Sequence, residues 1–142
     1  MGKTVLLLSC TGTKQNVCHP IPAKDLYTGD WFKLPFEYAK AKLHYDAAYI
    51  LSAKHHVVEL DDRLDYYNWS LRDDMNAAER REWAAETLRQ LQEKGCDLEN
   101  DEFIFLTGEK YYENLISKIK HHREPLKGFN NGTLKSWYKK VM

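Results

Sequence analysis

Thr4-Val5-Leu6-Leu7-Leu8-Ser9 is the stretch that decides the fold, because it is a continuous apolar run that ends in a polar turn. An unbroken run of this length is typical of a strand buried on both faces of a sheet. Two further runs have the same character, at Ala47–Ser52 and at Glu102–Thr107. The sequence therefore predicts three strands of the kind found in parallel sheets.

Apolar stripes with helical spacing lie between and after these runs. The first covers Phe32–Leu43. A second helix is expected to begin at Asn76, whose side chain can cap it, and to end at Gly95. Two later stripes predict a third helix over Tyr112–Ile119 and a short fourth helix at about 132–140. The stretches 11–30 and 54–74 are polar and are expected to be mostly irregular.

The order of strands and helices alternates, which is typical of an α/β domain with helices on both faces of a parallel sheet. We expect one domain over residues 1–142, with three layers and a mainly parallel sheet of about three or four strands. In such sheets the ligand crevice lies beyond the carboxyl ends of the strands. The turns after the strands are therefore the expected site.

The composition excludes several classes of protein. The 142-residue chain carries 21 basic and 21 acidic residues, so no global positive charge draws it onto nucleic acid. No apolar run reaches the roughly 18 residues of a membrane helix, and the apolar start is too short for a signal peptide. Three cysteines without a secretion signal predict reduced thiols. We therefore expect a cytoplasmic protein without a membrane partner.

Small and basic residues fill the turn after the first strand. Gly12 allows backbone amides to face a ligand, and Lys14 adds a positive charge, as in loops that hold phosphate or carboxylate groups. The spacing is not that of a Walker loop, and an ordinary polar turn is the alternative interpretation. Ser9, Thr11, Gly12 and Lys14 are predicted to bind the ligand.

Cys10 is the candidate nucleophile in this turn. A thiol at a strand end, near a lysine and a histidine, could have a lowered pKa and react. A cysteine that closes an apolar run is also commonly a small buried residue. The sequence leaves both interpretations open.

The turn after the second strand, Ser52-Ala53-Lys54-His55-His56, carries the other candidates. Lys54 can bind phosphate, and His55 can move protons near neutral pH. His56 contributes to the pocket or is a structural loop residue. Asp65, at the end of an acidic stretch, could orient a histidine or hold a ribose hydroxyl. Lys54 and His55 join Cys10 in the predicted catalytic set, and Ser52, His56 and Asp65 join the predicted binding set.

Other candidate residues are open to more than one interpretation. Ligand types for a metal are present, but their spacing fits no familiar zinc pattern, so no metal or cofactor is predicted. Tyr66, Tyr67 and Trp69 could stack on a base or cover the core. The basic stretch 118–140 is either a solvated face or a nucleic-acid patch. His121 and His122 within it are expected at the end of a helix.

Several segments, in this order, resemble an uncharacterised domain family found in bacteria and their phages. They are Ser9-Cys10 with Lys14, Ala23-Lys24-Asp25-Leu26-Tyr27, Tyr49-Ile50-Leu51-Ser52-Ala53-Lys54-His55, the loop ending in Asp65-Tyr66, and the close of the chain from Pro125 to Trp137. The resemblance covers nearly the whole chain. It extends more distantly to the YaaA peroxide-stress proteins, which are associated with DNA binding, and to a domain of archaeosine synthase, which acts on a modified tRNA base.

The resemblance implies chemistry on a nucleotide, a nucleic acid or a modified base. Carried over by position, it implies roles for Cys10, Lys14, Lys24, Asp25, Tyr27, Ser52, Lys54 and His55. One position departs from the family pattern, because His56 stands where a glycine usually follows Lys-His. Glycine permits a left-handed backbone there, and histidine adopts one at some cost.

Three hypotheses for the function follow. The leading one is an enzyme that acts on a nucleotide, nucleoside or modified nucleobase, with an anion held at the strand ends. The second is a DNA- or RNA-binding module without catalysis, and the third is a protein that sequesters a nucleotide unaltered. The sequence leaves the reaction, the substrate and the oligomeric state open.

Overall fold

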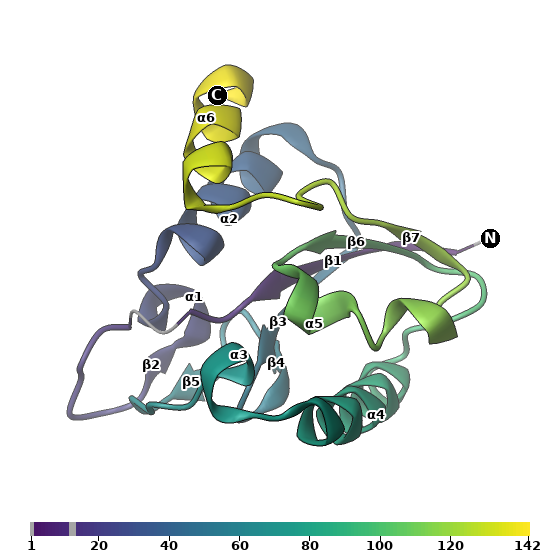
Figure 1. Ribbon diagram of the computed structural model, residues 1–142, viewed down its shortest axis with the longest axis horizontal. Helices are drawn as coiled ribbons and strands as arrows, with labels where there is room; N and C mark the ends of the chain where they lie inside the picture. Colours follow the sequence, from purple (N-terminus) through teal and green to yellow (C-terminus); the bar gives the residue numbers. More distant parts are fainter. Residues whose placement is uncertain (1, 12–13) are drawn as a thin grey trace.

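A five-stranded sheet forms the centre of the molecule, in the order β4-β3-β1-β6-β7 (Figure 1). The computed structural model describes residues 2–11 and 14–142. The strands are β1 (Thr4–Ser9), β3 (Ala47–Ser52), β4 (His56–Glu59), β6 (Glu102–Leu106) and β7 (His121–Arg123). All neighbouring pairs are parallel except β3 and β4. The prediction of a mainly parallel sheet is confirmed.

The apolar run of β1 lies in the middle of this sheet. Leu7 pairs with Tyr49 of β3 on one side and with Phe105 of β6 on the other. The four residues Val5–Leu8 have no exposed surface. Burying such side chains contributes about 1.5–3 kcal/mol each, which is why the run has no polar alternation.

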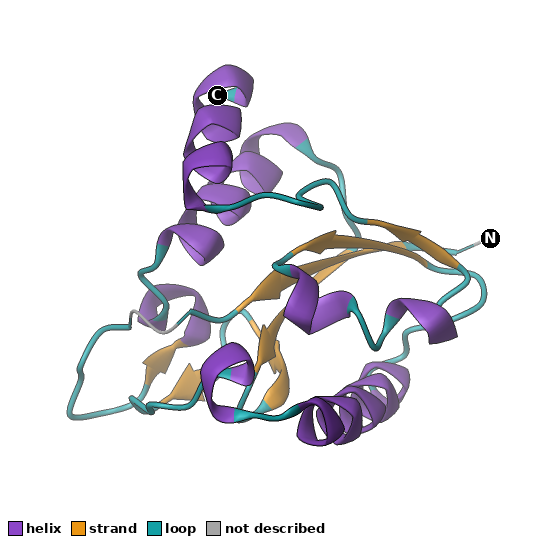
Figure 2. Cartoon of the chain, viewed as in Figure 1, coloured by secondary structure: helices purple, strands orange, loops and turns teal. Residues whose placement is uncertain are grey.

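Helices cover both faces of the sheet, as the layered arrangement predicts (Figure 2). On one side lie α2 (Asp30–Lys42) and α6 (Asn131–Val141), and on the other α3 (Leu71–Asp74), α4 (Ala77–Glu93) and α5 (Glu109–Tyr112). None of the described helices is both long and apolar enough to cross a membrane.

The predicted helix over Tyr112–Ile119 is wrong. Helix α5 ends at Tyr112, and a 3₁₀ turn at Ile116–Lys118 leads into β7. Leu115 is fully buried, as the apolar stripe requires. The apolar stripe correctly indicated which side chains face the core, but a short helix and a 3₁₀ turn carry them in place of one continuous helix. His121 and His122 consequently lie in a strand and not at a helix end.

The two stretches expected to be irregular contain short elements that hold the loops in place. In the first are β2 (Ile21–Pro22) and α1 (Ala23–Leu26). In the second are β4, α3 and β5 (Arg63–Leu64). Strands β2 and β5 pair antiparallel, so the two loops are joined beside the main sheet.

Candidate functional site

The ends of three parallel strands bring the predicted turns to one edge of the sheet. Ser9 ends β1 and Cys10 follows it, the turn 52–56 begins at the last residue of β3, and Thr107 follows β6. Strand β3 lies on one side of β1 and β6 lies on the other, so the connections that leave β1 and β3 lead to opposite sides of the sheet. Ligand crevices of open α/β sheets form at such a switch point.

A chain of buried hydroxyl groups forms the floor of this edge. The Tyr27 and Tyr67 hydroxyls are 2.6 Å apart, and Tyr67 Oη is 2.8 Å from Ser52 Oγ. Ser52 Oγ in turn accepts the backbone N–H of His55 at 3.0 Å. Burial raises the pKa of both tyrosines above its ordinary value, so both keep their protons. The network fixes the turn after β3 against the loop that carries Tyr67.

Two lysines lie against the same aromatic ring and form, with it, the lysine–tyrosine cluster (Lys14, Lys54 and Tyr67). Lys14 Nζ is 4.4 Å from the centroid of the Tyr67 ring, and Lys54 Nζ is 5.7 Å from it. Within the described part of the chain, neither ammonium group pairs with a carboxylate. Both positive charges are therefore available to a ligand.

Lys14 is held in place by its backbone. It forms a β-bridge with Tyr27, and the next amide, of Gln15, donates to the Leu26 carbonyl at 2.8 Å. The side chain is half-buried, and burial lowers its pKa, while the Cys10 sulfur opposes this shift. A bound anion would favour the charged form of this amine.

Cys10 is buried, and its sulfur has two hydrogen-bond partners; the Tyr111 hydroxyl also donates to the Cys10 carbonyl at 3.3 Å. Its Sγ atom is 3.0 Å from the hydroxyl of Tyr111, and the Ala53 N–H donates to the sulfur at 3.4 Å. The expected histidine neighbour is thus replaced by a tyrosine from α5, and His55 forms no described hydrogen bond with the thiol. Sequence reasoning missed Tyr111, which lies one residue before the apolar stripe of its segment.

The two histidines after β3 have different environments. The His55 ring meets the edge of Tyr67 at 5.2 Å between centroids, and burial together with the Lys54 charge lowers its pKa. His56 stacks on Trp83 at 6.1 Å and 19°, and its backbone has a φ of 63°. Burial also lowers the pKa of His56.

Beside this turn lies a depression of about 260 Å³, the aromatic pocket. Its lining consists of Ala53, His56, Trp69, Met75, Glu79, Glu82 and Trp83. Trp83 is anchored to the sheet edge because its Nε1–H donates to the Ser52 carbonyl at 2.9 Å. The pocket and the lysine–tyrosine cluster therefore share the 52–56 turn.

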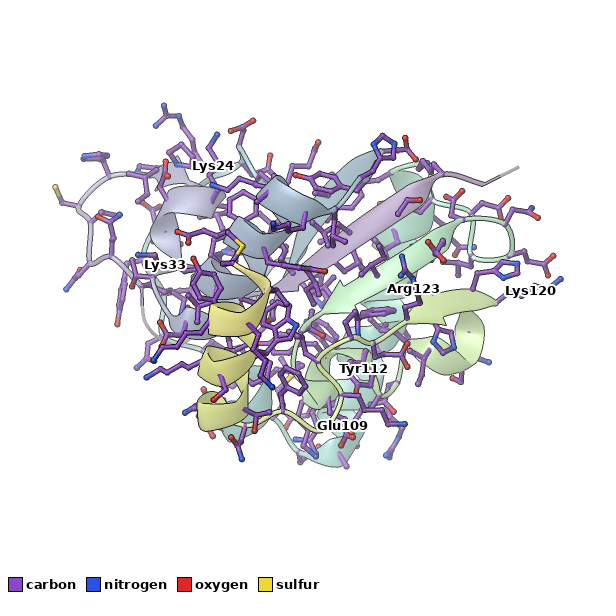
Figure 3. All side chains as sticks on the ribbon, turned by 90° about the horizontal axis from the view of Figure 1, so that it is seen from above. Lys24, Lys33, Glu109, Tyr112, Lys120 and Arg123 are labelled. Atoms are coloured by element: carbon purple, nitrogen blue, oxygen red, sulfur yellow. The ribbon has the colours of Figure 1, made fainter. Side chains whose placement is uncertain are left out.

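Several predicted binding residues lie apart from this cluster. Lys24, labelled in Figure 3, is exposed and pairs with Asp61 at 2.8 Å. Asp25 and Asp65 are exposed. The Thr11 hydroxyl accepts the Gly29 amide at 3.3 Å, and Ser9 is buried in the sheet.

Gly12, to which we assigned exposed amides, lies outside the described residues. Among the described residues, no group of three histidine, cysteine or acidic side chains is placed to hold a metal ion.

Comparison with known proteins gives one match. No curated protein and no solved structure matches the chain. Residues 5–140 match a family of unknown function, DUF6884, so the match extends from β1 through α6 and includes every element that builds the site. The chain therefore belongs to this family of unknown function.

Proposed function

We propose that this protein binds a phosphate-bearing nucleotide at the carboxyl edge of its sheet and acts on it as an enzyme. The observation that carries the proposal is the lysine–tyrosine cluster, in which two ammonium groups face one ring without a described carboxylate partner. The resemblance of Ser9-Cys10 and of Leu51–His55 to YaaA proteins, and of the element from Cys10 to Lys14 to a domain of archaeosine synthase, favours the same class of substrate.

The electrostatics of the cluster favour an anion. A ring face attracts a cation but carries no net charge, so the two lysines remain uncompensated. Half-burial of Lys14 costs solvation that a phosphate would restore through charge-assisted hydrogen bonds. Each such bond contributes roughly 1.5–3 kcal/mol.

Binding is tested by calorimetry of the full chain with nucleoside monophosphates. We expect Lys54→Ala and Lys14→Ala each to weaken binding about 10-fold or more, as the loss of one charge-assisted bond implies. The matched control is Lys33→Ala, an exposed lysine of α2 (Figure 3), which should bind as the wild type does. Equal binding by all three variants would reject the site.

The catalytic part of the proposal rests on Cys10. Its sulfur lies at the strand end, 3.0 Å from the Tyr111 hydroxyl, and accepts the Ala53 N–H at 3.4 Å. We expect the wild type to convert its ligand, and Cys10→Ala to bind the ligand without converting it. Mass spectrometry of the recovered ligand distinguishes an enzyme from a sequestering protein, because a sequestering protein would return the ligand unaltered.

The nucleic-acid hypothesis depends on the basic C-terminal stretch. Three of its side chains have acidic partners: Arg123 with Glu102 at 3.3 Å, His122 with Glu124 at 2.7 Å, and Lys135 with Asp30 at 3.6 Å. The ion pairs of Arg123 and Lys135 reduce the local positive charge. Oligonucleotide binding that falls steeply with salt, and that is indifferent to Lys54→Ala, would favour this hypothesis instead.

A further inference from the structure

The aromatic pocket has features that the core does not require. Trp69 lines it and keeps 40% of its surface exposed, although a tryptophan is costly to leave in water. His56 forms another wall, and it is the one described residue other than glycine with a positive φ. A strained backbone that holds a side chain in a pocket is a recurring sign of function.

The pocket is rigid where it meets the lysine–tyrosine cluster. The Trp83 ring is fixed by its bond to Ser52 and by its stack on His56. Ala53, which lines the pocket, also donates its N–H to the Cys10 sulfur. A molecule in the pocket would therefore lie next to the turn that carries Lys54 and His55.

The size and charge of the pocket indicate that it would hold one part of a ligand and not the whole ligand. About 260 Å³ is below the roughly 300–1,000 Å³ of pockets that hold whole ligands, so the volume suits a single flat ring system. Two exposed carboxylates, Glu79 and Glu82, are among its lining residues and would repel a phosphate. Glu79 is engaged by the Asn76 amide, whereas Glu82 has no hydrogen-bond partner among the described residues.

We propose that the aromatic pocket is the base subsite of the nucleotide site. The base stacks against Trp69, and the N–H groups on its edge donate hydrogen bonds to the Glu82 carboxylate. The inference rests on the proposed nucleotide function. Guanine fits this chemistry best, because its N1–H and 2-amino group can donate in parallel to the two oxygens of one carboxylate. Uracil presents carbonyl oxygens on either side of its single N–H, and a carboxylate repels them.

Calorimetry of the full chain with GMP, UMP, guanosine and ribose 5-phosphate tests this subsite. We expect GMP to bind more tightly than UMP. Trp69→Ala should weaken GMP about 5- to 150-fold, the range for loss of one base–ring stack, and should leave ribose 5-phosphate unchanged. Glu82→Gln should bring GMP and UMP close to parity. The matched control is Tyr66→Ala, because Tyr66 is equally exposed in the same loop but does not line the pocket.

The four probes separate failure of the subsite from failure of the proposed function. Equal binding of GMP and ribose 5-phosphate, with no effect of Trp69→Ala, would overturn the base subsite, even if Lys54→Ala still weakened both. Conversely, ribose 5-phosphate binding that is indifferent to Lys54→Ala would reject the phosphate site. Guanosine binding that is lost in Trp69→Ala would support the subsite in that case.

Discussion

At the scale of single residues, His56 combines an unfavourable backbone with a specific side-chain contact. A residue with a Cβ atom pays roughly 1–2 kcal/mol in the left-handed region, and glycine pays nothing. The stack on Trp83 offsets part of this cost. The histidine thus stands at a position where backbone stability alone favours glycine.

Replacing His56 by glycine and by alanine separates these two effects. Both variants lose the stack on Trp83, but only the alanine variant keeps the left-handed strain at φ 63°. We expect His56→Gly to be more stable than His56→Ala by about 1 kcal/mol in urea unfolding. Equal stabilities would show that the turn in solution does not have this conformation.

The site was predictable from the sequence to the extent that it depends on strand ends. The rule for parallel sheets placed Cys10, Ser52 and Lys54 at one edge, and the structure brings them there. Their contacts with Tyr67 and Tyr111 were not predictable, because Tyr67 lies in a polar loop and Tyr111 lies just before the apolar stripe of its segment. Which hydroxyl meets which thiol is decided by tertiary packing, and no local pattern encodes it.

At the scale of elements, the sequence patterns that predicted helices and strands correctly were those in which local chemistry and burial favour the same structure. Apolar runs gave β1, β3 and β6, and the Asn76 cap gave the start of α4. Strand β7 was missed because its sequence, His121-His122-Arg123, is polar and suits a sheet edge, where charge discourages further pairing. An edge strand of three residues carries no periodic signal.

The start of α4 provides a prediction at this scale. The Asn76 side chain accepts the Glu79 N–H at 2.8 Å, and Glu79 Oε1 accepts the Asn76 N–H at 2.9 Å, which completes a capping box. We expect Asn76→Ala to lower the free energy of unfolding by about 1 kcal/mol in urea titration. Glu79→Gln is the control, because glutamine keeps both bonds and should change stability little. A neutral Asn76→Ala would mean that the helix end is frayed.

At the scale of the whole molecule, the buried tyrosines make stability depend on alkaline pH. Burial raises the pKa of Tyr27, Tyr67 and Tyr111 above the ordinary value of 10.0. Above about pH 10 the unfolded chain loses these protons while the folded chain keeps them. Their contribution is therefore fully present below pH 10 and is lost as the pH rises toward the folded pKa values.

We expect the urea midpoint to fall steadily above pH 10, with tyrosinate absorbance rising in two stages. The tyrosines whose pKa is raised by burial, Tyr27, Tyr67 and Tyr111, should ionise in the second stage, only as the chain unfolds. Tyr67→Phe removes one buried group, so its midpoint should fall less steeply with pH, although the variant starts lower because Tyr27 and Ser52 each lose a partner. Ionisation of all nine tyrosines in one stage near pH 10, with secondary structure retained, would contradict the buried hydroxyl network.

The same network positions Ser52 and, through it, the turn that carries Lys54. We therefore expect loss of nucleotide binding to accompany the second stage of ionisation and not the first.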